Sequence, residues 1–271
     1  MGYAERYITV SGLKTRYLEA GKGPALILMH GASLGSSADV WALSMEPLAT
    51  LGFRVIAYDD PGYGVSDDPP DLTVQHRVAF FVQLLKALGI RQAHVIAHSQ
   101  AGGVAVIVAL EQPELFAKLM IIGTGSLVAP LPGQGPDEYS EGAEHEPTLD
   151  EVKEELKVHV FNVEAVPSEL IEGRLRMSTG PRFQSYLKRR TAPRTTTGDV
   201  QPPLWERVNE LKMPFLMLYG RADTRNHVAE RAERAKQSLP HLRIELMDRA
   251  SHLLQWDRPD EFHKVAAGFL K

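Results

Sequence analysis

The chain has 271 residues, of which 44% are hydrophobic and 24% charged, and it contains no cysteine. This composition is typical of a globular protein that buries a substantial core, and it excludes disulfides, thiolate metal sites and a cysteine nucleophile. Because the formal net charge is −4, the protein lacks the positive field that holds nucleic acid, and we expect no nucleic-acid partner.

The first 129 residues alternate strand-like and helix-like segments. Short apolar runs bounded by turn formers predict strands, and longer stretches with helical spacing predict helices. The expected strands are Ile8–Val10, Thr15–Ala20, Ala25–Met29, Phe53–Tyr58, His94–Ala97 and Lys118–Ile122, and the expected helices are Trp41–Leu51, Thr73–Leu88 and Gln100–Glu111. Repeated strand–helix units predict an α/β fold with a mostly parallel sheet flanked by helices.

Helix formers dominate the next part of the chain, where strand-like runs are missing. The helices expected there are Thr148–Val160, Pro167–Met177 and Phe183–Arg190. Alternation resumes with the segments Pro214–Tyr219, Val228–Ser238, His241–Met247 and Pro259–Leu270. We therefore predict an α/β core formed by residues 1–129 and 205–271, with residues 130–204 inserted as a helical cap.

Ser99 lies where a predicted strand meets a predicted helix, within the sequence AHSQA. Small residues two positions before and after a nucleophile allow the sharp strand-to-helix turn that exposes its oxygen. Alanines stand here where glycines are usual. Although Ser99 alone is also compatible with a simple helix cap, the strand before it and the helix after it favour a nucleophile.

A serine alcohol needs a base that takes its proton and a third group that orients the base. Asp223 and His252 each follow one of the two last predicted strands. Taken singly, each is more typical of a polar surface residue. Taken together with Ser99, in the chain order Ser, Asp, His, they predict a catalytic triad of the α/β-hydrolase type.

The sequence HGAS, residues 30–33, directly follows the strand expected at Ala25–Met29. Acyl transfer places negative charge on an oxygen, which backbone N–H groups of such a loop and of the residue after the nucleophile stabilise. We predict that Ala32 and Gln100 supply these oxyanion-hole donors and that the His30 imidazole is structural. No segment has the spacing of a metal or nucleotide site, and we expect neither a metal nor a cofactor.

Over nearly its whole length the sequence resembles the carbon–carbon bond hydrolases of aromatic meta-cleavage pathways. The resemblance rests on the segments TRYLEAG at 15–21, HG at 30–31, RVIA at 54–57, the turn at 59–64, AHSQA, GRAD at 220–223 and SH at 251–252. It implies an α/β-hydrolase fold with a helical cap and cleavage of a vinylogous 1,5-diketone, in its dienol form, to a dienoic acid and a second carboxylic acid. In the cap, Arg174 matches an arginine that contacts substrate in the family. Because other basic residues lie close to it in the sequence, Arg174 is also compatible with a solvated surface charge of the cap.

The sequence departs from this family where the pocket is expected. The family's turn usually reads GNSMG, and its catalytic histidine is usually followed by tryptophan rather than by Leu253. We expect Ser33, His98 and Leu253, together with Arg174, to contact the substrate. The departures leave open a carboxylesterase or lactonase with the same triad, a ligand receptor with slow turnover, and a cofactor-independent oxygenase or lyase.

The N-terminal residues carry charge where a signal peptide has an apolar run, and no segment reaches the roughly 18 apolar residues of a membrane span. We therefore expect a cytoplasmic protein without a membrane partner. Its expected partner is a small-molecule substrate, either anionic or derived from an aromatic compound. The sequence leaves a homodimer open.

Overall fold

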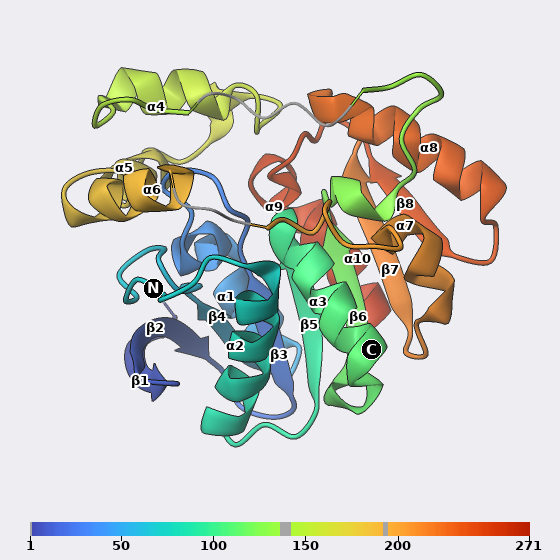
Figure 1. The fold of residues 1–271 in the computed structure, drawn as a ribbon, viewed down its shortest axis with the longest axis horizontal. Helices are drawn as coiled ribbons and strands as arrows, with labels where there is room; N and C mark the ends of the chain where they lie inside the picture. The colour runs from blue at the N-terminus through green and yellow to red at the C-terminus, as the bar shows by residue number, and fades with distance from the viewer. Residues whose placement is uncertain (1, 136–141, 192–194) are drawn as a thin grey trace.

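The computed structural model describes residues 2–135, 142–191 and 195–271. Its centre is an eight-stranded sheet with the strand order β1-β2-β4-β3-β5-β6-β7-β8 (Figure 1). The pairs β1–β2 and β2–β4 are antiparallel and the other pairs are parallel, which confirms the predicted mostly parallel sheet. The strands are β1 (Ala4–Val10), β2 (Leu13–Ala20), β3 (Ala25–Met29), β4 (Arg54–Tyr58), β5 (Ala93–His98), β6 (Phe116–Ile122), β7 (Phe215–Gly220) and β8 (Arg243–Met247).

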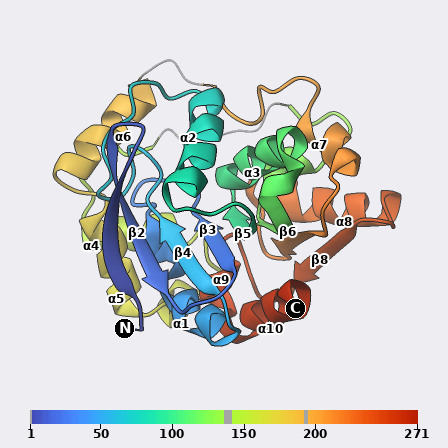
Figure 2. The ribbon, with the colours of Figure 1, turned by 90° about the horizontal axis from the view of Figure 1, so that it is seen from below.

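Helices cover both faces of the sheet (Figure 2). On one face lie α2 (Val74–Ala87), α3 (Gln100–Glu111) and α8 (Val228–Ser238), and on the other lie α1 (Ala42–Thr50), α9 (Leu254–Asp257) and α10 (Pro259–Leu270). In β3, Ile27 packs into the first hydrophobic cluster and Leu28 into the second. Because neighbouring strand residues point to opposite faces, a strand covered on both sides is apolar throughout.

Between β6 and β7, the described residues form helices and no strand. These helices are α4 (Leu149–Leu156), α5 (Ser168–Arg176), α6 (Pro181–Thr191) and α7 (Leu204–Arg207). In Figure 1, α4, α5 and α6 lie beyond the end of the sheet from which α3 starts. Val152 of α4 and Ile171 of α5 join the second hydrophobic cluster of the core. The division at residues 130 and 204 stays a prediction, and residues 136–141 and 192–194 within it lie outside the described residues.

The observed bounds differ from the expected ones where hydrophobic periodicity is weak. β1 starts at Ala4 rather than Ile8, because its first four residues are exposed and alternate without an apolar face. The helices α7 and α9 have four residues each, which is too short to show a helical period of hydrophobic residues in the sequence. In the described part of the chain, no helix combines the length and hydrophobicity that crossing a membrane requires.

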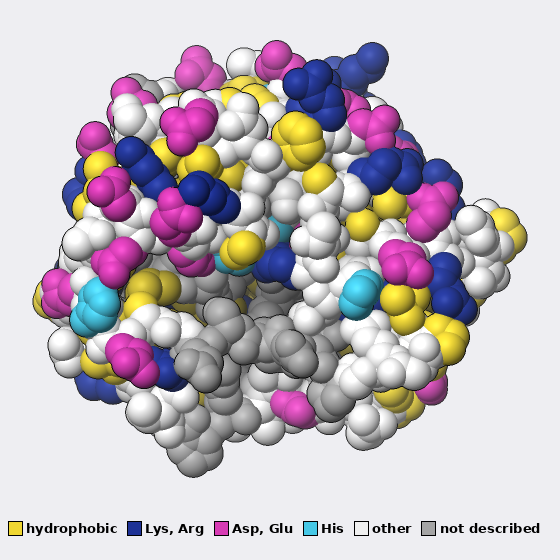
Figure 3. All heavy atoms as spheres, turned by 90° about the horizontal axis from the view of Figure 1, so that it is seen from above, with side chains coloured by type: hydrophobic (Ala, Val, Ile, Leu, Met, Phe, Trp, Pro, Cys, Tyr) yellow, Lys and Arg dark blue, Asp and Glu magenta, His cyan; other side chains and the backbone are white. Residues whose placement is uncertain are grey.

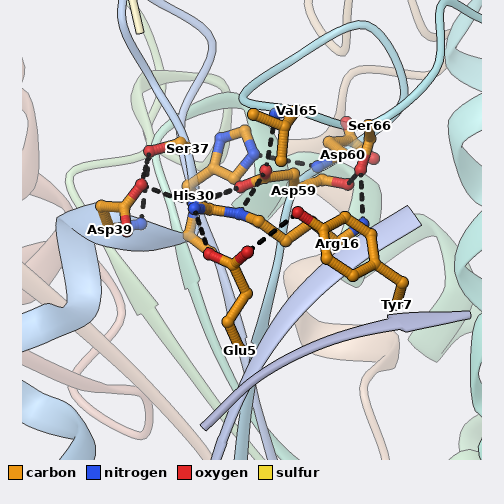
Figure 4. A network of polar contacts seen from close by, with 11 residues as sticks. Glu5, Tyr7, Arg16, His30, Ser37, Asp39, Asp59, Asp60, Val65 and Ser66 are labelled. Atoms are coloured by element: carbon orange, nitrogen blue, oxygen red, sulfur yellow. Dashed lines mark hydrogen bonds and ion pairs between the residues drawn. The ribbon is translucent and has the colours of Figure 1, made fainter. Parts of the chain in front are cut away.

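A buried network of polar contacts fastens the loop after β4 to β2 (Figure 4). Arg16, which is 4% exposed, donates from Nε to Asp59 Oδ2 over 2.8 Å and from Nη2 to Asp39 over 2.5 Å. Asp59 also accepts the backbone N–H groups of Ala38, over 2.7 Å, and Val65, over 2.9 Å. Because each buried charge has partners, the network ties the segment before α1 and the loop after β4 into one unit.

Replacing Arg16 by methionine leaves the Asp59 carboxylate buried without its main partner. Removing one partner of a buried ion pair typically costs about 3–5 kcal/mol, so we expect the free energy of unfolding to fall by about that amount. Urea denaturation followed by circular dichroism measures it. The control is Arg207→Met, which breaks the more exposed pair with Glu210 and should cost less than about 1 kcal/mol. Equal losses in the two variants would contradict the role of the network.

Candidate active site

Ser99 joins β5 to α3 in a strained turn. Its φ of 56° and ψ of −129° lie outside the regions that L-residues favour. The Ser99 N–H donates to the Ile122 carbonyl over 2.9 Å, and the Thr124 hydroxyl donates to the Ser99 carbonyl over 2.7 Å. Strain of this kind persists only where the surroundings hold it, and it is frequent at functional sites.

Two glycines let neighbouring loops approach this turn closely. A Cβ on Gly31 would lie 3.0 Å from the Ser99 Cβ, and a Cβ on Gly123 would lie 2.8 Å from His252 Nδ1. Gly123 also has a φ of 61°, which glycine adopts without strain. Both positions therefore keep the space around Ser99 and His252 free of side-chain atoms.

Asp223 and His252 form a buried hydrogen-bonded pair. His252 Nδ1 lies 2.9 Å from Asp223 Oδ2, and the two residues are 4% and 1% exposed, in that order. An ionised carboxylate only accepts hydrogen bonds, so the proton is assigned to Nδ1 and the lone pair to Nε2. His252 and Ser99 line the same cavity. The three residues, predicted from distant parts of the chain, thus lie at the same edge of the sheet.

Arg225 makes further contacts with the Asp223 carboxylate. Its Nε and Nη2 lie 3.1 Å from Oδ1 and Oδ2, and its backbone N–H donates to Oδ1 over 3.2 Å. Burial would raise the pKa of Asp223, but the hydrogen bond from His252 and the charges of His252 and Arg225 hold it below its ordinary value. Burial lowers the pKa of His252, the Arg225 cation lowers it further, and Asp223 opposes both. His252 is therefore neutral at pH 7, which is the form of a base.

The contacts continue from Arg225 toward Ser33. Arg225 Nη1 lies 3.2 Å from His159 Nδ1, and His159 Nε2 lies 2.8 Å from Glu155 Oε1. Glu155 accepts from Arg174 Nε over 3.2 Å and from Nη2 over 3.0 Å, and Arg174 Nη2 also donates to Ser33 Oγ over 2.9 Å. The sequence did not single out Arg225, His159 or Glu155. The only local signals were the position of Arg225 two residues after Asp223 and the four-residue spacing of Glu155 and His159.

The loop after β3 lies opposite the first turn of α3. Ala32 and Gln100, the predicted oxyanion-hole residues, both line the cavity with Ser99. Gln100 opens α3, so its N–H belongs to the first turn, whose N–H groups have no partner within the helix. The Ala32 N–H donates to none of the residues that the structure describes. The loop itself is fixed by His30, whose Nε2 accepts the Asp60 N–H over 3.0 Å.

His98 and Leu253, two of the predicted substrate contacts, take different positions. The His98 ring lines the cavity, its centroid is 4.4 Å from that of His252, and its Nε2 lies 3.1 Å from the His252 carbonyl oxygen. Its buried Nδ1 has no hydrogen-bond partner in the described part of the chain. Leu253 is 3% exposed and packs into the second hydrophobic cluster, away from the cavity lining. Ser33 and Arg174 both line the cavity.

The cavity lies between the end of the sheet and the helices α4, α5 and α6. It has a volume of about 1630 Å³, which exceeds the roughly 300–1,000 Å³ of most ligand pockets. Figure 3 looks onto this side of the molecule and shows a hollow in which histidine and basic side chains are visible. Among the described residues, no group of three or more carboxylate or imidazole side chains has the arrangement of a metal site.

Known proteins resemble the chain in both sequence and structure. A sequence model of the alpha/beta hydrolase family matches residues 26–265. A 2-hydroxy-6-oxononadienedioate/2-hydroxy-6-oxononatrienedioate hydrolase of Paraburkholderia phymatum is 31% identical, over 95% of this chain and 91% of its own length. A 2-hydroxy-6-oxo-6-phenylhexa-2,4-dienoate hydrolase of Comamonas testosteroni is 28% identical, over 97% of this chain and 93% of its own length.

Solved structures share the fold over the whole chain. The 2-hydroxy-6-oxo-6-phenylhexa-2,4-dienoate hydrolase of Rhodococcus sp. superposes with a TM-score of 0.78 at 22% identity, covering 99% of this chain and 98% of that one. A bacterial membrane phospholipase A superposes with a TM-score of 0.76 at 23% identity, covering 99% of this chain and 86% of that one. At these identities the likeness concerns the fold alone.

Replacing Arg225 by glutamine removes a cation that disfavours protonation of His252. The pKa of His252 should therefore rise, and an NMR titration of the histidine ring protons measures it. Arg221→Gln serves as the control, because Arg221 is exposed and pairs with Asp248 and Glu233 instead of Asp223. This control should leave the pKa of His252 unchanged. An unchanged His252 pKa in the Arg225→Gln variant would show that Arg225 does not set the charge of the pair.

Proposed function

The chain belongs to the alpha/beta hydrolase family and is a hydrolase, and from this premise we propose that Ser99, His252 and Asp223 form its catalytic triad. The proposed reaction is cleavage of a carbon–carbon bond next to a carbonyl in a dienol diketone of the meta-cleavage type. The observation that carries the proposal is the buried Asp223–His252 pair beside the cavity that His252 shares with the strained Ser99.

The roles of the triad follow from its protonation. With its proton on Nδ1, His252 offers the Nε2 lone pair to the Ser99 hydroxyl or to a water molecule that attacks the carbonyl. Asp223 keeps the imidazole in this tautomer and stabilises the imidazolium that forms. Arg225 holds the carboxylate in place from its other side. As a positioning residue, Arg225 acts through Asp223.

The developing oxyanion would be met by the backbone N–H groups of Ala32 and Gln100. Both residues line the cavity beside Ser99, and neither N–H is committed to a partner in the described part of the chain. Preorganised donors of this kind are typically worth about 3 kcal/mol each in barrier height.

Hydrolysis of a carbon–carbon bond adds the elements of water across that bond. The carbonyl carbon gains the hydroxyl oxygen and becomes a carboxylic acid, while the neighbouring carbon leaves with the bonding electrons and gains a proton. A conjugated dienol system supports this step, because its keto form accepts the electrons as an enolate. The large cavity, with both apolar and polar residues in its wall, suits such an elongated substrate.

The substrate class is supported by the relatives, whose names are those of hydrolases acting on 2-hydroxy-6-oxo dienoates. By this proposal the protein takes part in the breakdown of aromatic compounds. A carboxylesterase or lactonase is the second candidate. It is favoured by one observation, the pairing of Arg174 with Glu155, since a neutralised arginine offers less to a substrate carboxylate.

Replacing Ser99 by alanine removes the proposed nucleophile without changing the buried core. We expect turnover to fall by about 10⁴- to 10⁶-fold, as in other serine hydrolases that lose a triad member. The substrate 2-hydroxy-6-oxo-6-phenylhexa-2,4-dienoate loses its colour on cleavage, and p-nitrophenyl acetate releases a coloured phenol, so both rates are read by absorbance.

The control is Ser126→Ala, another serine in the cavity wall, which should keep its rate within about tenfold of the wild type. Retention of the rate in Ser99→Ala would remove Ser99 from the mechanism. Turnover of the ester by the wild type without loss of the dienoate colour would instead replace carbon–carbon cleavage by ester hydrolysis.

A further inference from the structure

Arg189, on α6, is a buried cation with little to balance it. It is 8% exposed, and its guanidinium carbon lies 3.9 Å from the centroid of the Tyr63 ring. It has no hydrogen bond or ion pair with any residue in the described parts of the chain, and its Nη1 is buried without a partner. Asp68, whose pKa Arg189 helps to lower, instead pairs with Lys188 over 2.9 Å. Because a buried charge without an acceptor is costly, this arrangement favours an anionic ligand.

The other arginines of the cavity wall are committed to partners. Arg174 is held by both oxygens of Glu155 and by Ser33. Arg190 donates to the Ala143 carbonyl over 2.9 Å, and Arg231 donates to backbone carbonyls. The Arg174–Glu155 pair carries no net charge, and Arg190 and Arg231 have carbonyl acceptors, whereas the buried Arg189 Nη1 has no acceptor among the described residues.

Arg189 shares the cavity wall with Gln100, one of the two predicted oxyanion-hole residues. Together with Tyr63 and Gln100 it lines both the main cavity and a recess of about 40 Å³ next to it. The Tyr63 hydroxyl donates to the Ala32 carbonyl over 3.3 Å. The recess is also lined by His76, whose buried Nε2 has no partner among the described residues. Its volume fits a small polar group, because a cavity needs about 10–15 Å³ of such space to hold one water.

We infer that Arg189, rather than Arg174, binds the anionic group of the substrate, a carboxylate, where the recess opens beside Tyr63 and Gln100. The inference rests on the proposed function, since it names part of the substrate of the same site. Glu155 then acts as an internal counterion that keeps Arg174 from binding the carboxylate. The substrate chain lies with its carboxylate toward α6.

The test measures binding in a Ser99→Ala background, so that no turnover is needed. The probes are 5-oxo-5-phenylpentanoate, a stable keto acid, and its methyl ester, which differ by one negative charge. Isothermal titration calorimetry gives the dissociation constant of each probe. We expect the parent to bind the carboxylate at least about tenfold more tightly than the ester, because a hydrogen bond to a charged group is worth that factor.

Adding Arg189→Gln should weaken carboxylate binding by about 10- to 100-fold and ester binding by less than about threefold. Replacing Arg174 and Glu155 together by glutamine removes this ion pair without changing the net charge, and it should change the binding of the two probes equally. Arg176→Gln, which removes an exposed charge outside the cavity, should change neither. Adding Glu155→Gln should tighten carboxylate binding, because it frees the Arg174 cation.

Three results would overturn the inference: no preference of the parent for the carboxylate, a loss in Arg189→Gln that is equal for both probes, or a selective loss of carboxylate binding when Arg174 and Glu155 are both replaced by glutamine. If circular dichroism shows that Arg189→Gln is unfolded, Arg189→Lys replaces it. That variant keeps the charge but not the planar fork, so it should weaken carboxylate binding about three- to tenfold, and an unchanged affinity counts against the inference. If the wild type does not bleach the dienoate but Arg189 still selects the carboxylate probe over its ester, only carbon–carbon cleavage is rejected and the inference on Arg189 stands.

Discussion

The hydrogen bond between Asp223 and His252 is the contact on which the proposed chemistry of the site depends. Both groups are buried, so the carboxylate and the imidazole each need a partner in order to stay in place. Arg225 supplies the remaining partner of Asp223 and, by its charge, favours the neutral form of His252. A neutral imidazole fixed in one tautomer is thus built into the fold before any substrate arrives.

The parallel sheet explains how residues far apart in the sequence reach this contact. Strands that run in one direction end at the same edge, and Ser99, Asp223 and His252 each follow such an end. The strain at Ser99 is offset by hydrogen bonds to Ile122 at the end of β6 and from the Thr124 hydroxyl just after it, and by glycines that permit close packing. The helices between β6 and β7 close this edge into a cavity that charged side chains line.

The positions of Ser99, Asp223 and His252 after the ends of strands were predictable because their signals are local. A nucleophile motif between a strand and a helix, and two polar residues after late strands, are visible without knowing any long-range contact. The charges of the cavity wall were not predictable, because Glu155 meets Arg174, and His159 meets Arg225, only through the placement of α4 and α5 over the sheet. For the same reason Arg174 was predicted to bind substrate without its counterion, Leu253 was expected at a wall that it does not line, and Arg189 was not singled out among its basic neighbours.

The central claim is that this architecture activates one serine among many. Incubation of the native protein with a fluorophosphonate, followed by mass spectrometry of its peptides, tests this directly, because the reagent phosphonylates a serine only where a base and oxyanion donors assist it. The account predicts a single adduct, located on Ser99 and missing from protein that was unfolded beforehand. An adduct on a different serine, or none on the native protein, would contradict it.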